Sequence, residues 1–322
     1  MSVPAEPNAT QFSHPVVRLF AATRPAFLSV TLMAVLLGFA SAVLSGYGLA
    51  MIPATLTLVF ALVAHAGANV LNDYYDAKNG CDFAESERIF PYTGGSRFIQ
   101  NGILSQRFIG CFGAILLLCV IPAGLWLAWH SASGLLLIGM AGLFIGWAYS
   151  APPFQLQARG LGEFGITAGW LLVVVGTDFV QRHSFSWMPV AVGLGFALLV
   201  ANVLFINQFP DVRADKIAHK RTVVVRLGAT RARWGYLIIT VLCYFWLGAM
   251  VGLKVLPTLA LLALIPMVLN LMAFRDLMHY ATQPAQLSRA IQLTIASTLA
   301  HGLILTLVSY STQRHLKWFE WF

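Results

Sequence analysis

Long apolar runs dominate this sequence and limit what the chain can fold into. Nine of them are about long enough to cross a hydrocarbon core as helices, and they lie at 27–46, 50–71, 108–129, 132–149, 164–181, 187–208, 234–252, 255–273 and 290–310. Charged residues make up 10% of the chain, less than half of the roughly 25% usual in soluble domains, and the mean hydropathy is +0.76. The sequence therefore predicts an all-α, polytopic membrane protein with about nine transmembrane helices.

Lysine and arginine are distributed unequally between the two ends of these helices. If the amino terminus is cytoplasmic, the segments on the inner side hold 16 of the 20 Lys and Arg residues. By the positive-inside rule, this asymmetry predicts a cytoplasmic amino terminus in a bacterial-type inner (cytoplasmic) membrane. The net charge of +8 then reflects topology and affinity for anionic lipid headgroups, so no nucleic-acid partner is expected. The sequence leaves the oligomeric state open.

The chain divides into a tail and one membrane domain. Residues 1–24 are predicted to be a cytoplasmic tail, because they lack the apolar core and cleavage site of a removable signal peptide. Residues 25–322 are predicted to form a single transmembrane domain. Its ending, HLKWFEWF at 315–322, is typical of an aromatic belt at a membrane interface.

Two polar motifs interrupt the apolar pattern at matching positions. In the stretch ANVLNDYYDAKNGCD, Asn72 and Asp76 lie four residues apart where the second run ends. Asn207 and Asp211 have the same spacing where the sixth run ends. Four spans separate the motifs, so the chain direction is preserved and both emerge on the cytoplasmic face. We therefore expect two parallel pseudo-repeats, at about 25–163 and 164–310.

The residue types of these motifs favour a metal site. Polar and acidic groups at membrane depth usually face the bundle interior, and Asn and Asp four apart share one face of a helix. Carboxylate and amide oxygens suit Mg²⁺, which binds through a few carboxylates together with substrate phosphate oxygens. The alternative is that these acids are ordinary solvated helix ends. The predicted metal ligands are Asn72, Asp76, Asp82, Asn207, Asp211 and Asp215, of which Asp76 and Asp211 are also predicted to be catalytic.

Basic residues are interleaved with the acids, which indicates a metal ion bridged to a polyanion such as a diphosphate. The glycines of TGGS at 93–96 could bring backbone N–H groups to phosphate oxygens, or they could form a plain turn. Arg24 could instead be an interfacial anchor. The predicted diphosphate ligands are Lys78, Arg97, Lys220, Arg221 and Arg24.

These motifs resemble those of the UbiA superfamily of intramembrane prenyltransferases. The resemblance is carried by NDYYDAKNGCD at 72–82 and NQFPDVRADKIAHKRT at 207–222, and the nine-span pattern extends it over nearly the whole chain. It implies a helical bundle around a central cavity and two Mg²⁺ ions held by the two acidic motifs. The implied reaction transfers a polyprenyl group from polyprenyl diphosphate to a small aromatic acceptor.

Details of the motifs resemble the branch that acts on 1,4-dihydroxy-2-naphthoate in menaquinone biosynthesis. Five residues separate Asp76 from Asp82, and YSAPPFQLQARGLGE at 149–163 is also similar to that branch. Two departures are Pro210, where arginine is common in the branch, and His219, where glycine is common. Another aromatic or isoprenoid acceptor, for example 4-hydroxybenzoate, is the main alternative.

An allylic cation needs electron-rich faces nearby, because aromatic rings stabilise cations through their quadrupoles. Tyr149, at the cytoplasmic end of the fourth run, is the predicted catalytic aromatic residue, although an interfacial position would also suit a tyrosine. Arg159 could bind the acceptor carboxylate through its planar guanidinium. His65, inside the second run, is predicted to be a packing histidine, and Asp178 is predicted to pair with Arg182 four residues later.

Two other classes of membrane protein also carry polar residues inside their helical bundles. A secondary transporter would carry its polar site near the bilayer midplane, often on inverted repeats. Here the acids gather at one surface and the repeat is parallel. A CDP-alcohol phosphotransferase is also intramembrane and metal-dependent, but its single long aspartate signature is absent from this sequence.

Overall fold

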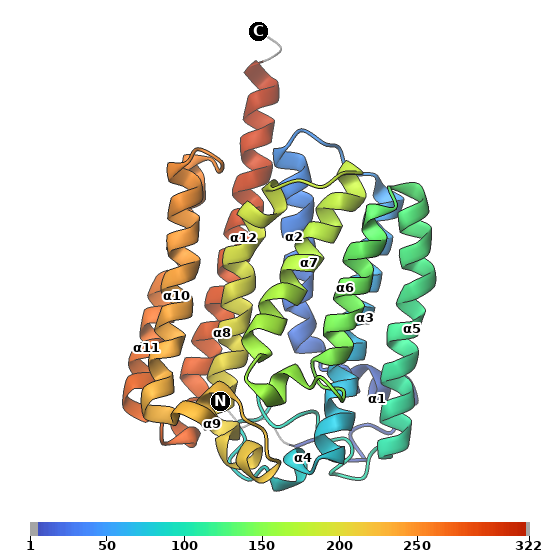
Figure 1. The fold of residues 1–322 in the computed structure, drawn as a ribbon, viewed down its shortest axis with the longest axis vertical. Helices are drawn as coiled ribbons and strands as arrows, with labels where there is room; N and C mark the ends of the chain where they lie inside the picture. Colours follow the sequence, from blue (N-terminus) through green and yellow to red (C-terminus); the bar gives the residue numbers. More distant parts are fainter. Residues whose placement is uncertain (1–5, 320–322) are drawn as a thin grey trace.

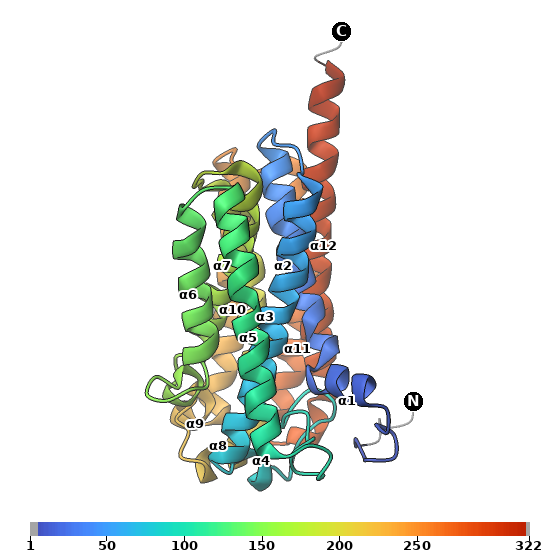
Figure 2. The ribbon, with the colours of Figure 1, turned by 90° about the vertical axis from the view of Figure 1, so that its right-hand side faces the viewer.

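The computed structural model describes residues 6–319, and the side chains of 6–312, as a bundle of roughly parallel helices (Figures 1 and 2). Helices satisfy every backbone hydrogen bond internally, which hydrocarbon surroundings demand. The long helices are α2 (Pro25–Leu44), α3 (Met51–Lys78), α5 (Gln106–His130), α6 (Gly134–Ala148), α7 (Gly162–Arg182), α8 (Met188–Ile217), α10 (Ala229–Gly252), α11 (Met267–Tyr280) and α12 (Ser288–Phe319). The short elements are α1 (Pro15–Ala22), α4 (Cys81–Ala84), α9 (Val223–Leu227), and the 3₁₀ segments η1 (Leu156–Arg159), η2 (Thr258–Leu264) and η3 (Pro284–Gln286).

The predicted membrane-spanning pattern is confirmed, with one short member. Within the described residues, eight segments are long and apolar enough to cross a membrane, and each corresponds to a predicted run. The remaining run is α6, which has only 15 residues and is therefore about 22 Å long. Pro152 and Pro153 follow shortly after its end and cannot continue a helix. The eighth predicted run is η2 followed by α11, which extends to Tyr280 rather than ending at 273.

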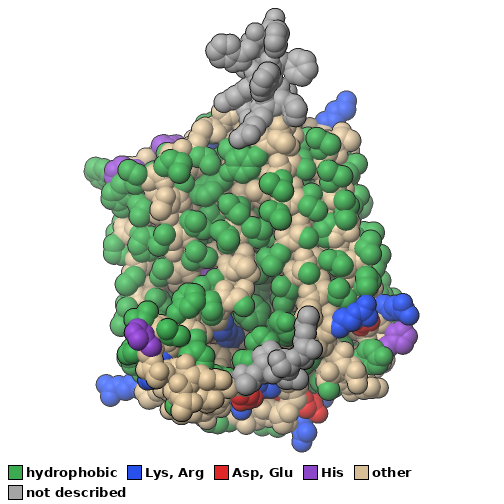
Figure 3. Space-filling model, turned by 180° about the vertical axis from the view of Figure 1, so that it is seen from behind, with side chains coloured by type: hydrophobic (Ala, Val, Ile, Leu, Met, Phe, Trp, Pro, Cys, Tyr) green, Lys and Arg blue, Asp and Glu red, His purple; other side chains and the backbone are tan. Residues whose placement is uncertain are grey.

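Charged side chains gather at one end of the bundle, and apolar side chains cover its length. Figure 3 shows a broad hydrophobic surface above a lower end where basic and acidic residues concentrate. That end carries α1, α4 and α9 (Figure 1). The distribution identifies an integral membrane protein whose loops on one side are much more polar than those on the other. The side chains of the aromatic ending lie outside the described residues.

Helix α8 is the centre of the bundle, because 78% of its apolar window is buried. Small residues bring neighbouring helices close together, as is usual inside membranes. A Cβ added at Gly38 on α2 would lie 2.5 Å from Thr177 Cβ and 2.7 Å from the carbonyl oxygen of Val174 on α7. The far end of α7 carries the predicted pair, with Arg182 Nε 2.7 Å from Asp178 Oδ2.

A cavity of about 620 Å³ lies on one side of α8. Its walls come from α2, α3, α5, α6 and α7, together with α8, and most of the lining side chains are aliphatic or aromatic. The polar end of the cavity is formed where α3 and α8 end and where the loop between α4 and α5 folds over them. The fold therefore places an apolar cavity next to the two acidic motifs.

Candidate active site

The two acidic motifs meet at the polar end of the cavity. Both α3 and α8 run past the apolar runs predicted for them, so each motif lies on the last helical turns. Lys220 Nζ lies 2.8 Å from Asp76 Oδ1 on α3 and 3.6 Å from Asp215 Oδ1 on α8. The Cys81 thiol is 3.5 Å from the same Asp215 oxygen. The spacing-based prediction that two helix ends converge over one site agrees with this geometry.

Amide and ammonium groups already surround the first motif. Asn72 Nδ2 donates to Asp76 Oδ2 at 2.9 Å, and Gln157 Nε2 donates to Asp76 Oδ1 at 3.1 Å. Burial alone lowers the pKa of Lys220, but the carboxylates of Asp76 and Asp215 raise it well above its usual value. Lys220 therefore stays protonated and offsets the charges of Asp76 and Asp215.

The second motif leaves two oxygens without partners. Asn207 Oδ1 and Asp211 Oδ1 are buried, and neither has a hydrogen-bond partner among the described residues. Both side chains line the cavity. Buried acceptors are almost always satisfied, so these two oxygens, one helical turn apart, fit a hard cation.

Within the described residues, no group of three or more His, Cys, Asp or Glu side chains is arranged closely enough to bind a metal ion by itself. The fit to Mg²⁺ therefore depends on the donor set and on the two unpartnered oxygens. Mg²⁺ commonly completes its coordination with water and substrate phosphate oxygens, so a full protein cage is not required.

Asp82 and the TGGS loop close the other side of the site. A Cβ added at Gly95, whose φ is +72°, would lie 2.8 Å from Asp82 Oδ2 and 3.1 Å from a guanidinium nitrogen of Arg24. Burial and then the nearby Asp76 carboxylate raise the pKa of Asp82 to about 7. Arg24 forms an ion pair with Asp73, whose other contact is the backbone N–H of Ser96. The loop thus approaches the acids by its backbone, which only glycine at this position permits.

The predicted basic ligands fall into two groups. Arg24 lines the cavity and Lys220 lies between the motifs. Arg97 donates to the backbone carbonyl of Asp82 at the rim. By contrast, Lys78 is exposed, with Nζ 5.9 Å from the Tyr74 ring centre, and Arg221 is also exposed.

The predicted acceptor ligand, Arg159, likewise lies outside the cavity lining. Its exposed guanidinium donates to the Pro153 carbonyl oxygen at 2.6 Å. The two prolines and the 3₁₀ segment η1 turn it to the surface. The geometry therefore gives no support to Lys78, Arg221 or Arg159 as ligands in this conformation.

Tyr149 follows the last residue of α6 and lines the cavity. Burial raises its pKa above the ordinary value, so its phenol stays neutral. It also borders a small polar chamber of about 70 Å³ that reaches Asp215 and Lys220. A half-buried aromatic ring thus lies beside the acidic motifs, at the place where a cation-stabilising tyrosine is expected.

Glu85 is a site residue that sequence reasoning missed. It is 7% exposed, and its carboxylate lies close to that of Asp211. Burial raises its pKa. Its position three residues after Asp82 was the available signal, but the loop fold that returns it to α8 cannot be read from spacing.

Comparisons with known proteins agree with this arrangement. The sequence model of the UbiA prenyltransferase family matches residues 31–298. The 2-carboxy-1,4-naphthoquinone phytyltransferase of Synechocystis sp. is 27% identical over 258 residues, 78% of this chain and 79% of that protein. The 1,4-dihydroxy-2-naphthoate octaprenyltransferase of Escherichia coli is 29% identical over 218 residues, 65% of this chain and 68% of that protein.

Solved structures show the same fold at lower identity. A UbiA homolog from Archaeoglobus fulgidus bound to DMAPP and Mg²⁺ is 17% identical, with a TM-score of 0.58 over 90% of this chain and 99% of that one. A UbiA homolog from Aeropyrum pernix is 17% identical, with a TM-score of 0.63 over 86% and 97%. These findings favour a prenyltransferase over the transporter and phosphotransferase alternatives. The chain belongs to the UbiA prenyltransferase family and is a transferase enzyme.

Proposed function

We propose that this enzyme transfers a polyprenyl group from polyprenyl diphosphate to 1,4-dihydroxy-2-naphthoate, with loss of CO₂, in menaquinone biosynthesis. The observation that carries the proposal is the meeting of two acidic motifs at the polar end of an apolar cavity. The acceptor is suggested by relatives whose names include naphthoate or naphthoquinone transfer. The site faces the cytoplasm in this proposal, because the basic loops lie on its side.

The donor set would hold two Mg²⁺ ions, one at each motif. Asn72, Asp76 and Asp82 supply one group of oxygens, and Asn207, Asp211 and Asp215 supply the other, with Glu85 beside them. When bound, the metal would neutralise negative charge that develops on the departing pyrophosphate.

The residues of this chain contribute charge, orientation and exclusion of water. The partly buried Arg24 and the buried Lys220 are cations at the polar end, where a diphosphate would displace their present carboxylate partners. The carbon–oxygen bond to the diphosphate breaks and leaves an allylic cation. The neutral Tyr149 ring stabilises this cation through its electron-rich face. The aliphatic walls keep water from capturing the cation.

The acceptor ring then forms the new carbon–carbon bond. For a naphthoate, the ring carbon bearing the carboxylate attacks, and that carboxylate leaves as CO₂. The electron pair of the broken bond restores the aromatic ring. A benzoate acceptor would instead lose a ring proton, so CO₂ release distinguishes the two acceptor classes.

The test is an assay of purified protein in lipid with Mg²⁺, a long-chain prenyl diphosphate, and either 1,4-dihydroxy-2-naphthoate or 4-hydroxybenzoate. We expect a prenylated naphthalene product and an equal amount of CO₂. Turnover of the benzoate alone would overturn the acceptor assignment. No turnover of either acceptor, with membrane content unchanged, would overturn the proposed reaction.

A further inference from the structure

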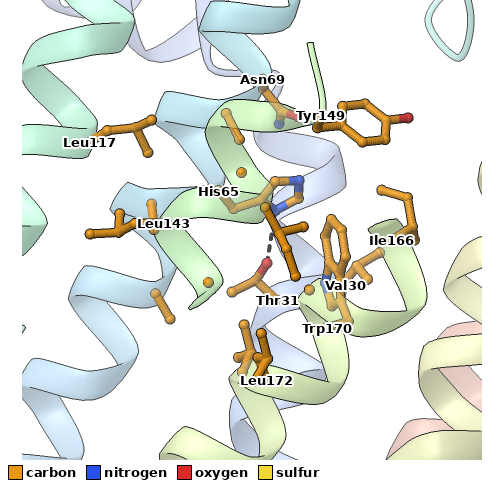
Figure 4. Close-up of a pocket in the computed structure, with 18 of the residues that line it drawn as sticks. Val30, Thr31, His65, Asn69, Leu117, Leu143, Tyr149, Ile166, Trp170 and Leu172 are labelled. Carbon is orange, nitrogen blue, oxygen red and sulfur yellow. Dashed lines mark hydrogen bonds between the residues drawn. The ribbon is translucent and has the colours of Figure 1, made fainter. Parts of the chain in front are cut away.

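A small group of polar side chains interrupts the apolar wall of the cavity. His65 on α3 lies 2.8 Å through Nδ1 from the hydroxyl oxygen of Thr31 on α2, as the dashed line in Figure 4 shows. Its ring meets the ring of Trp170 on α7 edge to face, with centroids 4.9 Å apart. All three residues line the cavity, so the predicted packing histidine faces a space that can hold a substrate.

The Thr31 hydroxyl forms a hydrogen bond with His65 rather than with a backbone carbonyl of its own helix. Threonines in membrane helices commonly donate to the carbonyl four residues earlier. Two other threonines of this cavity do so: Thr57 donates to Pro53 at 2.8 Å and Thr177 to Val173 at 2.7 Å. Thr31 instead reaches across to α3 and fixes the orientation of the imidazole.

Two hydrogen-bonding groups of this level face the cavity, and one of them has no partner. The indole N–H of Trp170 is buried and has no partner in the described part of the chain, whereas a buried indole usually finds one. The second ring nitrogen of His65 faces the side chain of Asn69, which also lines the cavity (Figure 4). Leaving the buried indole N–H unpaired in an apolar chamber is costly, so it indicates a polar ligand atom at this level.

The position of His65, Thr31 and Trp170 along the cavity indicates which part of a substrate could contact them. His65 lies seven residues before Asn72 on α3, which is two turns and about 10 Å deeper in the cavity. The diphosphate belongs at the level of the acidic motifs. A prenyl tail has no polar atom to offer.

We infer that His65, oriented by Thr31, binds a ring hydroxyl of the aromatic acceptor, with the Trp170 N–H as a further donor. This inference rests on the proposed function. A hydroxyl both donates and accepts, so it suits either tautomer of the imidazole. An acceptor ring that lies between the acidic motifs and His65 places its attacking carbon toward the diphosphate and its hydroxyl toward His65. His65 is therefore a positioning residue that selects hydroxylated acceptors.

The test compares two probes that differ only in their hydroxyl groups. Equilibrium binding of 1,4-dihydroxy-2-naphthoate, kept reduced, and of 2-naphthoate is measured by calorimetry on the full chain with Mg²⁺ and geranyl thiodiphosphate. We expect wild type to bind the hydroxylated probe about 10-fold more tightly. His65→Phe should bind both probes within about twofold of each other, while its affinity for geranyl thiodiphosphate is unchanged.

Matched variants separate this role from a purely structural tie between α2 and α3. Thr31→Val should lose most of the preference for the hydroxylated probe. Thr57→Val should keep it, because that hydroxyl bonds within its own helix. A full preference in both His65→Phe and Thr31→Val, or no preference in wild type, would overturn the inference. Failure of the proposed reaction is seen separately, as absent turnover, because these measurements need binding alone.

Discussion

At the scale of single residues, the two unpartnered oxygens of Asn207 and Asp211 are the strongest indication of a cation site. Asp211→Asn keeps the shape of the side chain and removes its charge. We expect turnover to fall at least about 100-fold, because metal ligation and charge neutralisation are both weakened. Initial rates over a range of Mg²⁺ concentrations, at equal membrane content, measure the effect.

The matched control for that change is Asp276→Asn. Asp276 lies near the same end of the bundle, but its carboxylate pairs with Arg289 at 3.3 Å and is absent from the cavity lining. Its activity should stay near that of wild type. Normal turnover in Asp211→Asn would remove this carboxylate from the mechanism.

Glu85 gives a second prediction at this scale. Because its buried carboxylate adjoins Asp211, Glu85→Gln should raise the Mg²⁺ concentration for half-maximal activity by about 10-fold. Glu87→Gln is the control, since Glu87 is exposed and its nearest cation, Arg213, is 4.0 Å away. An equal Mg²⁺ requirement in the two variants would show that Glu85 has no part in cation binding.

Lys220 links stability to metal binding. Lys220→Met leaves the buried Asp76 and Asp215 carboxylates without their shared cation, and breaking a buried pair typically costs about 3–5 kcal/mol. The thermal midpoint in EDTA should therefore fall well below that of wild type, and Mg²⁺ should restore part of the loss. The exposed Lys216, changed to Met, should show neither effect. A midpoint insensitive to Mg²⁺ in Lys220→Met would contradict the idea that this lysine stands in for a metal cation.

At the scale of helices, close packing of small residues holds the cavity walls in place. Gly38→Ala would force a methyl group against Thr177 and against the Val174 backbone on α7, where little movement is possible. We expect overpacking to cost about 1–3 kcal/mol and to lower the thermal midpoint. Gly248→Ala on α10 meets nothing within 4 Å and should leave the midpoint nearly unchanged. Equal midpoints in the two variants would mean that the contact between α2 and α7 relaxes freely.

The same scale shows how far the sequence could predict this structure. Apolar run length and motif spacing predicted the helices, their order and the meeting of Asp76 with the second motif, because both follow from helical periodicity. The loops were different. The path that brings Glu85 to Asp211, and the turn that exposes Arg159, depend on prolines, 3₁₀ segments and long-range contacts. Lys78 is predicted to bind the diphosphate because it lies two residues after Asp76, yet its side chain is on the exposed face of the helix.

At the scale of the whole molecule, the cavity opens toward the surrounding lipid between α5 and α6. Ile121 and Leu125 on α5, and Leu136 and Met140 on α6, line the cavity and are also 38–60% exposed. Such residues belong to both the chamber and the outer apolar surface. A long prenyl tail could therefore pass from the chamber into the bilayer without crossing polar groups.

The glycines of α6 give the last prediction. Gly139, Gly142 and Gly146 line the cavity, and a Cβ at each would meet nothing within 4 Å. Gly142 lies seven residues from Tyr149, about 10 Å along the helix, and Gly139 lies farther still. Leucine at Gly142 should fill the path of the tail there. The variant should keep kcat/KM for geranyl diphosphate and lose at least about 10-fold for long-chain diphosphates.

Leucine at Gly139 blocks a deeper point, so its loss should begin at a longer prenyl chain than that of Gly142→Leu. A series of geranyl, farnesyl, geranylgeranyl and longer diphosphates, each assayed at limiting concentration, measures both thresholds. Gly248→Leu on α10, outside the cavity lining, should follow the wild-type series. If both α6 variants lost activity equally for every chain length, the tail would not run along this helix. A threshold that moves with the position of the added leucine would place the tail beside α6 and give its direction away from the acidic motifs.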